Sequence, residues 1–380
     1  MFHSPLPADV ASAVLSYFSE SSYYTSDAAS ACLFVVLLGG TGQSGSVSAT
    51  EVEKMLHELP FWAGDGRNHL LLTLTSSPVG SDLLRGVNIG RAMIAQPYFI
   101  DTAFRPQFDV VIPPNLGPVS RDRVWHELPL ISPVRRKLLL SYLGEYSPIK
   151  LKDGGRSGRN LLEDNNHNSK FGLGGSSPER RKPLSVLDSS SSQSYYSHIE
   201  QAIVSSLKSF QVNYPGSADI TLSCGQSDRV SSIPSEWTMC NPEEKRRKLI
   251  LDSTFSLILL PLNTSLESTL AVQTRLYETL KHGAIPVIVG SHGQMPFEEL
   301  LRWESATVVL PTPRITEIPF FLQSFPDEAV SELRLRGRHF FLTYMSCTHA
   351  LLDSVLATLR LVIPSLLLSF SFHLPLTLLT

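Results

Sequence analysis

Two charged side chains, Arg275 and Glu278, stand one turn apart on a predicted amphipathic helix over Thr269–His282. The helix lies between two apolar runs, Leu257–Pro261 and Ala284–Gly290, and this order of strand, helix and strand predicts a βαβ unit. Parallel sheets bind ligands where the carboxyl ends of strands meet helix N-termini, whose free N–H groups favour anions. Arg275 and Glu278 could therefore hold a phosphate and a ribose. The alternative is a surface ion pair worth about 0.2–0.5 kcal/mol.

A loop ahead of the apolar run Leu70–Leu74 carries further polar side chains. The stretch Pro60–His69 combines aromatic residues, a tight glycine turn and the side chains of Asp65, Arg67 and His69. Substrate contacts tend to lie in loops of this kind at the edge of a strand. The loop therefore predicts either substrate contacts or a structural turn whose histidine is hydrogen-bonded.

A formal GxGxxG motif at Gly40–Gly45 follows the apolar run Ala31–Leu38, which predicts a buried strand. A dinucleotide fingerprint needs a helix that starts on its last glycine and an acid about 20 residues later on the next strand. Ser46–Thr50 is a poor helix start, and Asp65, the acid at that distance, lies in a glycine turn. A flexible loop is the better interpretation of this motif.

The sequence lacks the motifs of several enzyme classes. There is no nucleophile elbow, phosphate loop, HExxH or kinase motif, and no Asp-x-Asp pair that would hold a metal ion against a diphosphate. We therefore expect no metal and no cofactor, and any nucleotide would bind through helix N-termini and basic side chains. A net charge of −3 gives no electrostatic argument for a nucleic-acid partner.

The length of 380 residues exceeds what one hydrophobic core usually serves, so we expect two domains. Residues 1–26 form a peripheral segment, 27–133 a first α/β domain and 134–345 a second. Within the second domain, residues 151–194 are rich in Gly, Ser and Asn, which predicts a disordered insertion. Residues 346–361 form a closing helix, and 362–380 an apolar tail that either spans a membrane or is a divergent terminus.

Local signals complete the expected organisation. Thr50–Leu59, with Thr50 as N-cap, and Gly90–Ala95 predict helices. Cys224 and Cys240 flank a polar loop that a disulfide could close in an oxidising compartment, and buried free thiols are the equal alternative. Asn263 begins an Asn-Thr-Ser glycosylation acceptor. No signal peptide or anchor is visible at the N-terminus.

Short segments of both halves match one known family in order. They are Ser253–Phe255, Thr274–Glu278, Gly283–Ile288 and Pro296–Trp303 in the second half, and Phe61–Trp62, Gly66–Leu70, Gly90–Met93 and Arg105–Val110 in the first. These segments resemble the glycosyltransferase domain of the exostosin family. Trp237, placed before Cys240, and the run Arg314–Glu317 are most similar to its exostosin-like 3 branch.

The resemblance implies an α/β fold of the GT-B-like class, with two Rossmann-like α/β domains facing across a cleft. The acceptor would bind to the first domain and the nucleotide sugar to the second. Arg275 would then neutralise the diphosphate and Glu278 would bind the ribose, which fits a metal-free site. Thr274, Thr254 and Gly283 lie in the matching segments and are further candidates for donor binding.

The family implies transfer of glucuronic acid or N-acetylglucosamine from a UDP-sugar to a growing heparan sulfate or other glycosaminoglycan chain, with inversion. Inversion requires a general base on the acceptor side, for which His69 and Asp65 are candidates. The resemblance also implies exostosin-type homo- or heterodimers and a membrane-associated place in the Golgi or the lumen of the endoplasmic reticulum.

The chain departs from the family in two places. Many members carry a glycine after the proline that matches Pro261, where this chain has Leu262 and Asn263. The second, C-terminal transferase domain of exostosins, with its Asp-x-Asp motif, is absent from these 380 residues. A non-catalytic GT-B module that supports or presents a partner transferase is therefore the alternative function.

Overall fold

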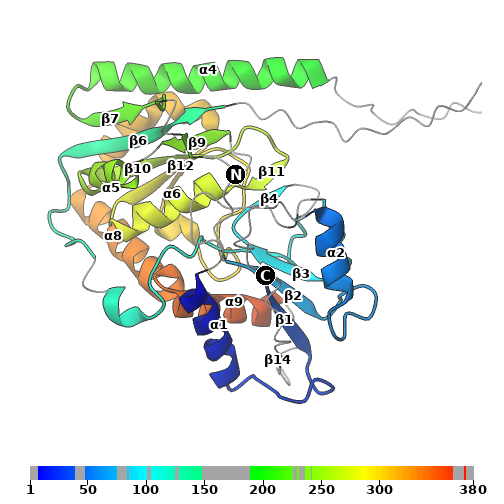
Figure 1. The fold of residues 1–380 in the computed structure, drawn as a ribbon. Helices are drawn as coiled ribbons and strands as arrows, with labels where there is room; N and C mark the ends of the chain where they lie inside the picture. The colour runs from blue at the N-terminus through cyan, green and yellow to red at the C-terminus, as the bar shows by residue number, and fades with distance from the viewer. Residues whose placement is uncertain are drawn as a thin grey trace, which may run out of the picture.

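Two β-sheets, each covered by helices, make up the fold (Figure 1). The computed structural model describes residues 7–38, 48–74, 84, 86–100, 104–124, 128–147, 189–225, 229–230, 236–240, 242–362 and 372–373. The glycine motif at Gly40–Gly45 and nearly all of the predicted insertion lie outside these residues, as does the apolar tail apart from 362 and 372–373.

The first sheet is parallel throughout and has the order β14-β1-β2-β3-β5. Its strands are β1 (Leu33–Leu38), β2 (His69–Thr73), β3 (Met93–Gln96), β5 (Val110–Val111) and β14 (Phe372–His373). Successive side chains of a strand point to opposite faces. Val35 and Leu37 accordingly join a core with α1 (Ala8–Glu20) and α9 (Thr348–Val362), whereas Val36 and Leu38 pack with α2 (Ala49–His57).

The second sheet has the order β13-β12-β10-β6-β9-β8, and β7 pairs with β6 beside this path. Its strands are β6 (Leu138–Tyr146), β7 (Ala218–Thr221), β8 (Arg229–Val230), β9 (Trp237–Cys240), β10 (Ser253–Leu259), β12 (Ile285–Val289) and β13 (Val308–Leu310). All of its pairings are parallel except those of β9, which runs antiparallel to β6 and β8. The predicted βαβ unit is confirmed, because Leu257 of β10 lies opposite Val287 of β12 in a parallel register.

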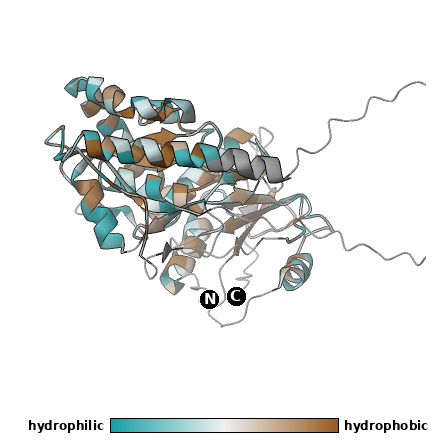
Figure 2. Cartoon of the chain, turned by 90° about the horizontal axis from the view of Figure 1, so that it is seen from above, coloured by the Kyte–Doolittle hydropathy of each residue, from teal (hydrophilic) through white to brown (hydrophobic). Residues whose placement is uncertain are grey.

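Helices cover both faces of this sheet, and each carries hydrophobic and hydrophilic residues (Figure 2). They are α4 (Ser189–Asn213), α5 (Glu243–Leu251), α6 (Leu270–Lys281), α7 (Ile318–Ser324) and α8 (Asp327–Phe340). A π-helical turn at Phe341–Met345 follows α8 and leads toward α9. Two parallel-sheet α/β domains confirm the expected GT-B-like fold class.

The two sheets are joined at the carboxyl ends of their strands. β4 (Phe99–Ile100), just after β3, pairs antiparallel with β11 (Leu266–Ser268), just before α6. The amide N–H of Phe297 donates to the carbonyl of Val111 at 3.0 Å. Carboxyl ends from both sheets therefore meet at one place, where open α/β sheets bind ligands.

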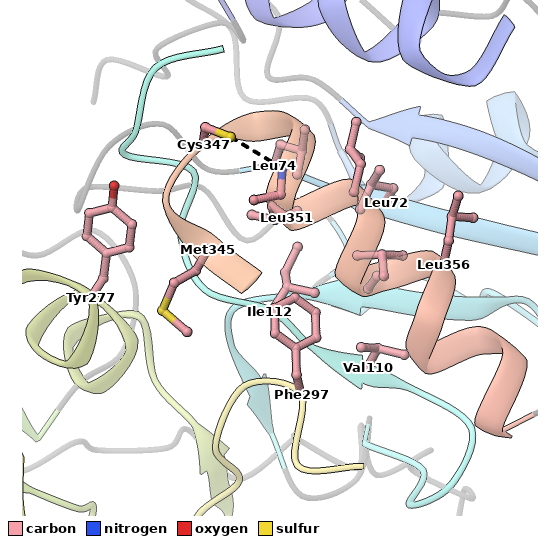
Figure 3. Close-up of a cluster of buried hydrophobic side chains, with 14 of the residues drawn as sticks. Leu72, Leu74, Val110, Ile112, Tyr277, Phe297, Met345, Cys347, Leu351 and Leu356 are labelled. Carbon is pink, nitrogen blue, oxygen red and sulfur yellow. Dashed lines mark hydrogen bonds between the residues drawn. The ribbon is translucent and has the colours of Figure 1, made fainter. Parts of the chain in front are cut away.

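A shared hydrophobic core also joins the domains. Leu72 and Val110 from the first sheet, Tyr277 from α6, and Leu351 from α9 belong to one buried cluster (Figure 3). Because α9 follows the second domain but packs on the first, the chain returns to its starting domain before it ends.

Three local expectations were wrong. Gly90–Ala95 was predicted as a helix, but Met93–Gln96 is β3, which lies between β2 and β5 in the first sheet. Short apolar runs fit a buried strand as well as a buried helix, and here pairing with β2 decides. The N-cap of α2 is Ser48, which forms a capping box with Glu51, and Thr50 lies inside the helix. Helix α4 begins at Ser189, inside the predicted insertion, since a helix with a buried face can extend into polar residues.

We expect Gly117→Ala to destabilise the protein. Gly117 lies in the segment between the domains, where an added Cβ would collide with the backbone carbonyl of Ser346 ahead of α9. Overpacking of this kind costs about 1–3 kcal/mol, and the free energy of unfolding in urea would measure it. Ser120→Ala is the control, because the Ser120 side chain forms no cap hydrogen bond. Equal stability of both variants would contradict the close contact.

Candidate functional site

Helix α6, which carries the predicted nucleotide-binding residues, is buried almost all round. Thr269 caps its first turn by accepting a hydrogen bond from the amide of Val272 at 3.3 Å. Arg275 is 7% exposed and Glu278 6%, so both charged groups lie inside the protein. The alternative of an exposed ion pair between them is wrong. Buried charges need partners inside the protein, and Arg275 and Glu278 bind to different groups.

Arg275 is bound by backbone carbonyl groups. Its guanidinium donates to the carbonyl of Leu143 on β6 and to that of Thr238 on β9, both at 2.9 Å. It also lies 4.7 Å from the centre of the Tyr142 ring. Burial lowers the pKa of Arg275. The guanidinium thus ties α6 to the point where β9 pairs with β6.

Glu278 forms a buried, two-pronged ion pair with Arg246 of α5. The Arg246 Nη2 atom lies 2.6 Å from Glu278 Oε1, and Nε lies 3.0 Å from Oε2. Arg246 also donates to the carbonyl of Cys240 at 3.0 Å, and a disulfide joins Cys240 to Cys224. Paired geometry of this kind satisfies both carboxylate oxygens. The ribose role of Glu278 stays a prediction that would require it to leave Arg246.

A small cavity lies beside these two residues. It has a volume of about 20 Å³ and is lined by Ser141, Tyr142, Arg275 and Thr279, among others. Within the described residues, the Ser141, Tyr142 and Thr279 hydroxyls and the Arg275 Nε atom have no hydrogen-bond partner. The cavity has room for about one water molecule, whereas small-molecule sites usually measure about 300–1,000 Å³. It cannot hold a nucleotide as it stands.

The other predicted donor-binding residues do not gather in one place. Thr274 is fully buried on α6 next to Arg275. Thr254 begins β10 and accepts a hydrogen bond from the amide of Arg136 at 2.9 Å. Gly283 precedes β12 with a φ of +68°, and its carbonyl accepts from Arg334 Nε at 2.9 Å. Thr254 and Gly283 therefore lie at the amino ends of the strands, opposite the edge where ligands usually bind.

At the carboxyl edge, the loop after β10 holds a carboxylate of the protein itself. Glu236 Oε2 accepts from the amides of Leu262 and Asn263 at 2.5 and 3.0 Å. Burial raises the pKa of Glu236, against the two backbone hydrogen bonds. Adjacent N–H groups at such a strand end commonly bind anionic ligands. Sequence analysis missed Glu236, because nothing in the spacing connects it to a loop 26 residues away.

The loop after β12 completes this edge. Gly290 and Gly293 have φ angles of +146° and +141°, a region that favours glycine. Between them, His292 Nε2 lies 3.3 Å from Glu267 Oε1 without the angle of a hydrogen bond. Sequence analysis also missed this pair. It is half-buried, and imidazole and carboxylate groups can both act in proton transfer.

The two predicted acid–base residues are placed differently from each other. His69 begins β2, is fully buried, and stacks on Phe34 with Nε2 3.3 Å from the Pro60 carbonyl. Burial lowers its pKa. Asp65 lies nearer the surface, paired with Arg67 at 2.9 Å. A general base must reach the acceptor hydroxyl, and His69 is buried. Its position therefore favours a packing role. The catalytic role of both residues stays a prediction.

Other site features can be placed as well. Asn263 is half-buried, and its side-chain oxygen accepts from the Ser265 amide at 2.9 Å. Among the described residues, no group of His, Cys, Asp or Glu is arranged to hold a metal ion. No single helix in the described ranges has the length and hydropathy of a membrane span, although the pair Asp327–Met345 and Thr348–Val362, bent by 87°, does so jointly.

We expect Glu278→Gln to destabilise the protein by about 3–5 kcal/mol, because it leaves Arg246 buried without a counter-charge. The double variant Arg246→Met with Glu278→Leu should recover most of this loss, since apolar side chains avoid the desolvation penalty. The free energy of unfolding in urea would be measured for the unchanged chain, the single variant and the double variant. Arg336→Gln removes an exposed pair with Glu332 and should change stability by less than about 1 kcal/mol. If Glu278→Gln were as stable as this control variant, the buried ion pair would be contradicted.

Comparison with known proteins identifies the family of the chain. The model of the exostosin GT47 domain matches residues 8–325. Exostosin-2 of Bos taurus is 26% identical over 353 residues, covering 92% of this chain and 39% of that protein. An exostosin-like-3 homolog of Caenorhabditis elegans is 38% identical over 117 residues, 31% of this chain and 13% of the homolog.

A solved structure, that of AviGT4, a glycosyltransferase involved in avilamycin A biosynthesis, aligns with a TM-score of 0.32 at 12% identity and covers 83% of this chain and 78% of its own. The chain spans about two fifths of the length of the exostosin-2 proteins that it matches. The exostosin expectation is confirmed by a family match that extends over both sheets. The chain belongs to the exostosin GT47 family of glycosyltransferase domains.

Proposed function

We propose that this domain acts in the assembly of a glycosaminoglycan chain, by transferring glucuronic acid or N-acetylglucosamine from a UDP-sugar with inversion. The family match over both domains supports this proposal. The domain would work in the Golgi or the lumen of the endoplasmic reticulum, membrane-associated and in an exostosin-type dimer. Its partners would be the UDP-sugar and the acceptor chain, without a metal or other cofactor.

The observation that carries the proposal is the composition of the carboxyl edge of the second sheet. The N-terminus of the 12-residue helix α6 lies there, beside the loop with Gly290 and Gly293. A helix N-terminus and a glycine loop let a diphosphate approach backbone N–H groups closely. His292 and Glu267 lie at the same edge, so this pair is our candidate for proton transfer.

Arg275 and Glu278 have a defined place in this scheme. They lie one and two turns inside α6, with their present partners on β6, β9 and α5. Their roles in binding diphosphate and ribose apply only if the donor displaces these partners. If the donor does not displace these partners, both residues act indirectly, by holding α6 and its N-terminus in place against the sheet.

We expect the chain to bind UDP, and His292→Ala to reduce sugar transfer about a hundredfold with little change in UDP affinity, because general acid–base catalysis contributes about 10²–10⁴-fold. Calorimetry with UDP and a transfer assay with UDP-sugars would measure the two effects. His339→Ala, which removes an exposed histidine of α8, is the matched control. Transfer by His292→Ala at the control rate would exclude the proton-transfer role.

A second function is favoured by one specific observation. The amides of Leu262 and Asn263, which could bind a donor phosphate, already bind the Glu236 carboxylate. A domain whose anion site is filled by its own side chain would support or present a partner transferase instead of transferring sugar. Failure of the intact chain to bind UDP or transfer sugar would leave this function standing and overturn the first.

Glu236→Ala tests whether the site is filled from within. The substitution frees two backbone N–H groups and removes a negative charge, so we expect UDP to bind about tenfold more tightly than to the unchanged chain. Calorimetry would measure the affinity. Glu243→Ala, which removes an exposed carboxylate from the first turn of α5, should leave it unchanged. Equal affinity of both variants would show that Glu236 does not occupy the donor site.

A further inference from the structure

A groove on the first domain lies between helices α1 and α9, which pack side by side (Figure 1). Its volume is about 670 Å³, within the range of about 300–1,000 Å³ that small-molecule sites usually have. Its walls come from α1, the turn that follows α1, and α9. None of these elements belongs to the proposed donor edge, so the groove is a separate place where a ligand fits.

The groove follows both helices lengthwise. Its lining residues fall on successive turns of α9 from His349 to Arg360, and on successive turns of α1 from Ala13 to Glu20. Residues three and four positions apart share one face of a helix, so each helix contributes one continuous face. At about 1.5 Å per residue, the stretch from His349 to Arg360 is about 16 Å long. The shape therefore suits an elongated ligand.

The middle of the groove is polar and is held by contacts between the helices. The Tyr17 hydroxyl donates to Asp353 Oδ1 at 2.6 Å, and Arg121 Nη2 donates to Asp353 Oδ2 at 3.1 Å. Asp353 thus has its counter-charge within the chain. Burial raises the pKa of Tyr17, and its hydrogen bond to Asp353 acts in the same direction, so the phenol keeps its proton. The Tyr17 ring lies 5.7 Å from the imidazole ring of His349.

Two charged groups of the groove are not used in this way. Arg360 is half-buried, and its guanidinium lies 4.1 Å from the centre of the Tyr23 ring. This cation–π contact orients the guanidinium, but its N–H groups still need acceptors. Glu20 on the opposite wall is exposed. Among the described residues, neither Arg360 nor Glu20 forms an ion pair. Both groups are therefore available to a ligand.

We propose that this groove binds a saccharide that carries a carboxylate, a uronic-acid segment of the acceptor chain, and that Arg360 binds the carboxylate. That the saccharide is the acceptor rests on the proposed function. A guanidinium matches the two oxygens of a carboxylate in geometry and charge. Glu20 accepts hydrogen bonds from sugar hydroxyls, and the tyrosine rings offer amphipathic surface to the sugar ring.

The position of the groove agrees with a site for a long chain. The amide of His349, at one end, donates to the carbonyl of Val119 at 3.3 Å, in the segment that joins the two domains. A saccharide in the groove would thus extend from the junction of the domains along the first domain. A purely structural role explains the contact of Tyr17 with Asp353, which ties α1 to α9, but it does not explain the volume between the helices.

Calorimetric titration of the intact chain, at constant ionic strength, with a non-sulfated oligosaccharide of alternating glucuronic acid and N-acetylglucosamine tests the proposal. We expect saturable binding that Arg360→Gln weakens about tenfold, because it removes a charge-assisted hydrogen bond. Arg360→Lys keeps the charge and should bind more tightly than Arg360→Gln. Arg336→Gln is the matched control, since it removes the same charge from an exposed ion pair on α8.

Oligomers of N-acetylglucosamine alone are the control on the side of the ligand, because they have similar rings without carboxylates. We expect them to bind more weakly than the acidic oligosaccharide, and equally to the unchanged chain and to Arg360→Gln. If Arg360→Gln weakened both ligands alike, the role of the carboxylate would be overturned. Free glucuronic acid that binds as tightly as the oligosaccharide would overturn the assignment to a chain segment.

The proposal as a whole is overturned if the acidic oligosaccharide shows no saturable binding, or if Arg360→Gln and Arg336→Gln bind it equally. UDP binding and sugar transfer by the unchanged chain distinguish this failure from that of the proposed function. Transfer without a contribution of Arg360 to oligosaccharide binding would overturn the groove alone. Binding through Arg360 by a chain that neither binds UDP nor transfers sugar would support the groove and leave presentation of the acceptor as the function.

Discussion

The burial of α6 on all sides is the constraint on which the second domain depends. A helix that is enclosed by β9, β10, β12, α5 and α8 cannot leave a charge unpaired, because desolvation would cost several kcal/mol. Arg275 is therefore bound to carbonyls of β6 and β9, and Glu278 to Arg246. The same contacts hold β9, α5 and α6 together, so the residues expected to bind a nucleotide also maintain the fold.

The regular elements of the second domain follow closely from the sequence. The runs around Leu257 and Val287 are apolar on both sides, as parallel strands covered by helices must be, and the helix between them has the required length. Ambiguity remained where runs were short. Met93–Gln96 has too few residues to show a period, so pairing with β2 and not local pattern decides its structure. The cap at Ser48 was missed because Ser46–Thr50 was judged a poor helix start, whereas Ser48 and Glu51 form a capping box there.

The partners within the candidate site could not be predicted from the sequence. Arg246 and Glu278 are 32 residues apart, and Glu236 lies 26 residues before the loop that it binds. Which side chains meet depends on how β9 turns back along β6, and a single antiparallel strand in a mostly parallel sheet has no signature in composition. Arg275 and Glu278 could be identified as chemically important, but whether they bind a ligand or the protein depends on these distant contacts.

The two edges of the second sheet differ in how their charges are balanced. At the carboxyl edge, where an open α/β sheet would present backbone N–H groups to an anion, the Glu236 carboxylate already binds two of them. At the amino edge, the Arg334 guanidinium donates to the backbone carbonyls of Gly283, Pro133 and Val134. Both edges are therefore held by contacts within the chain, a carboxylate bound by amides at one and a guanidinium bound by carbonyls at the other. A donor phosphate would have to displace the Glu236 carboxylate to reach the two amides of the carboxyl edge.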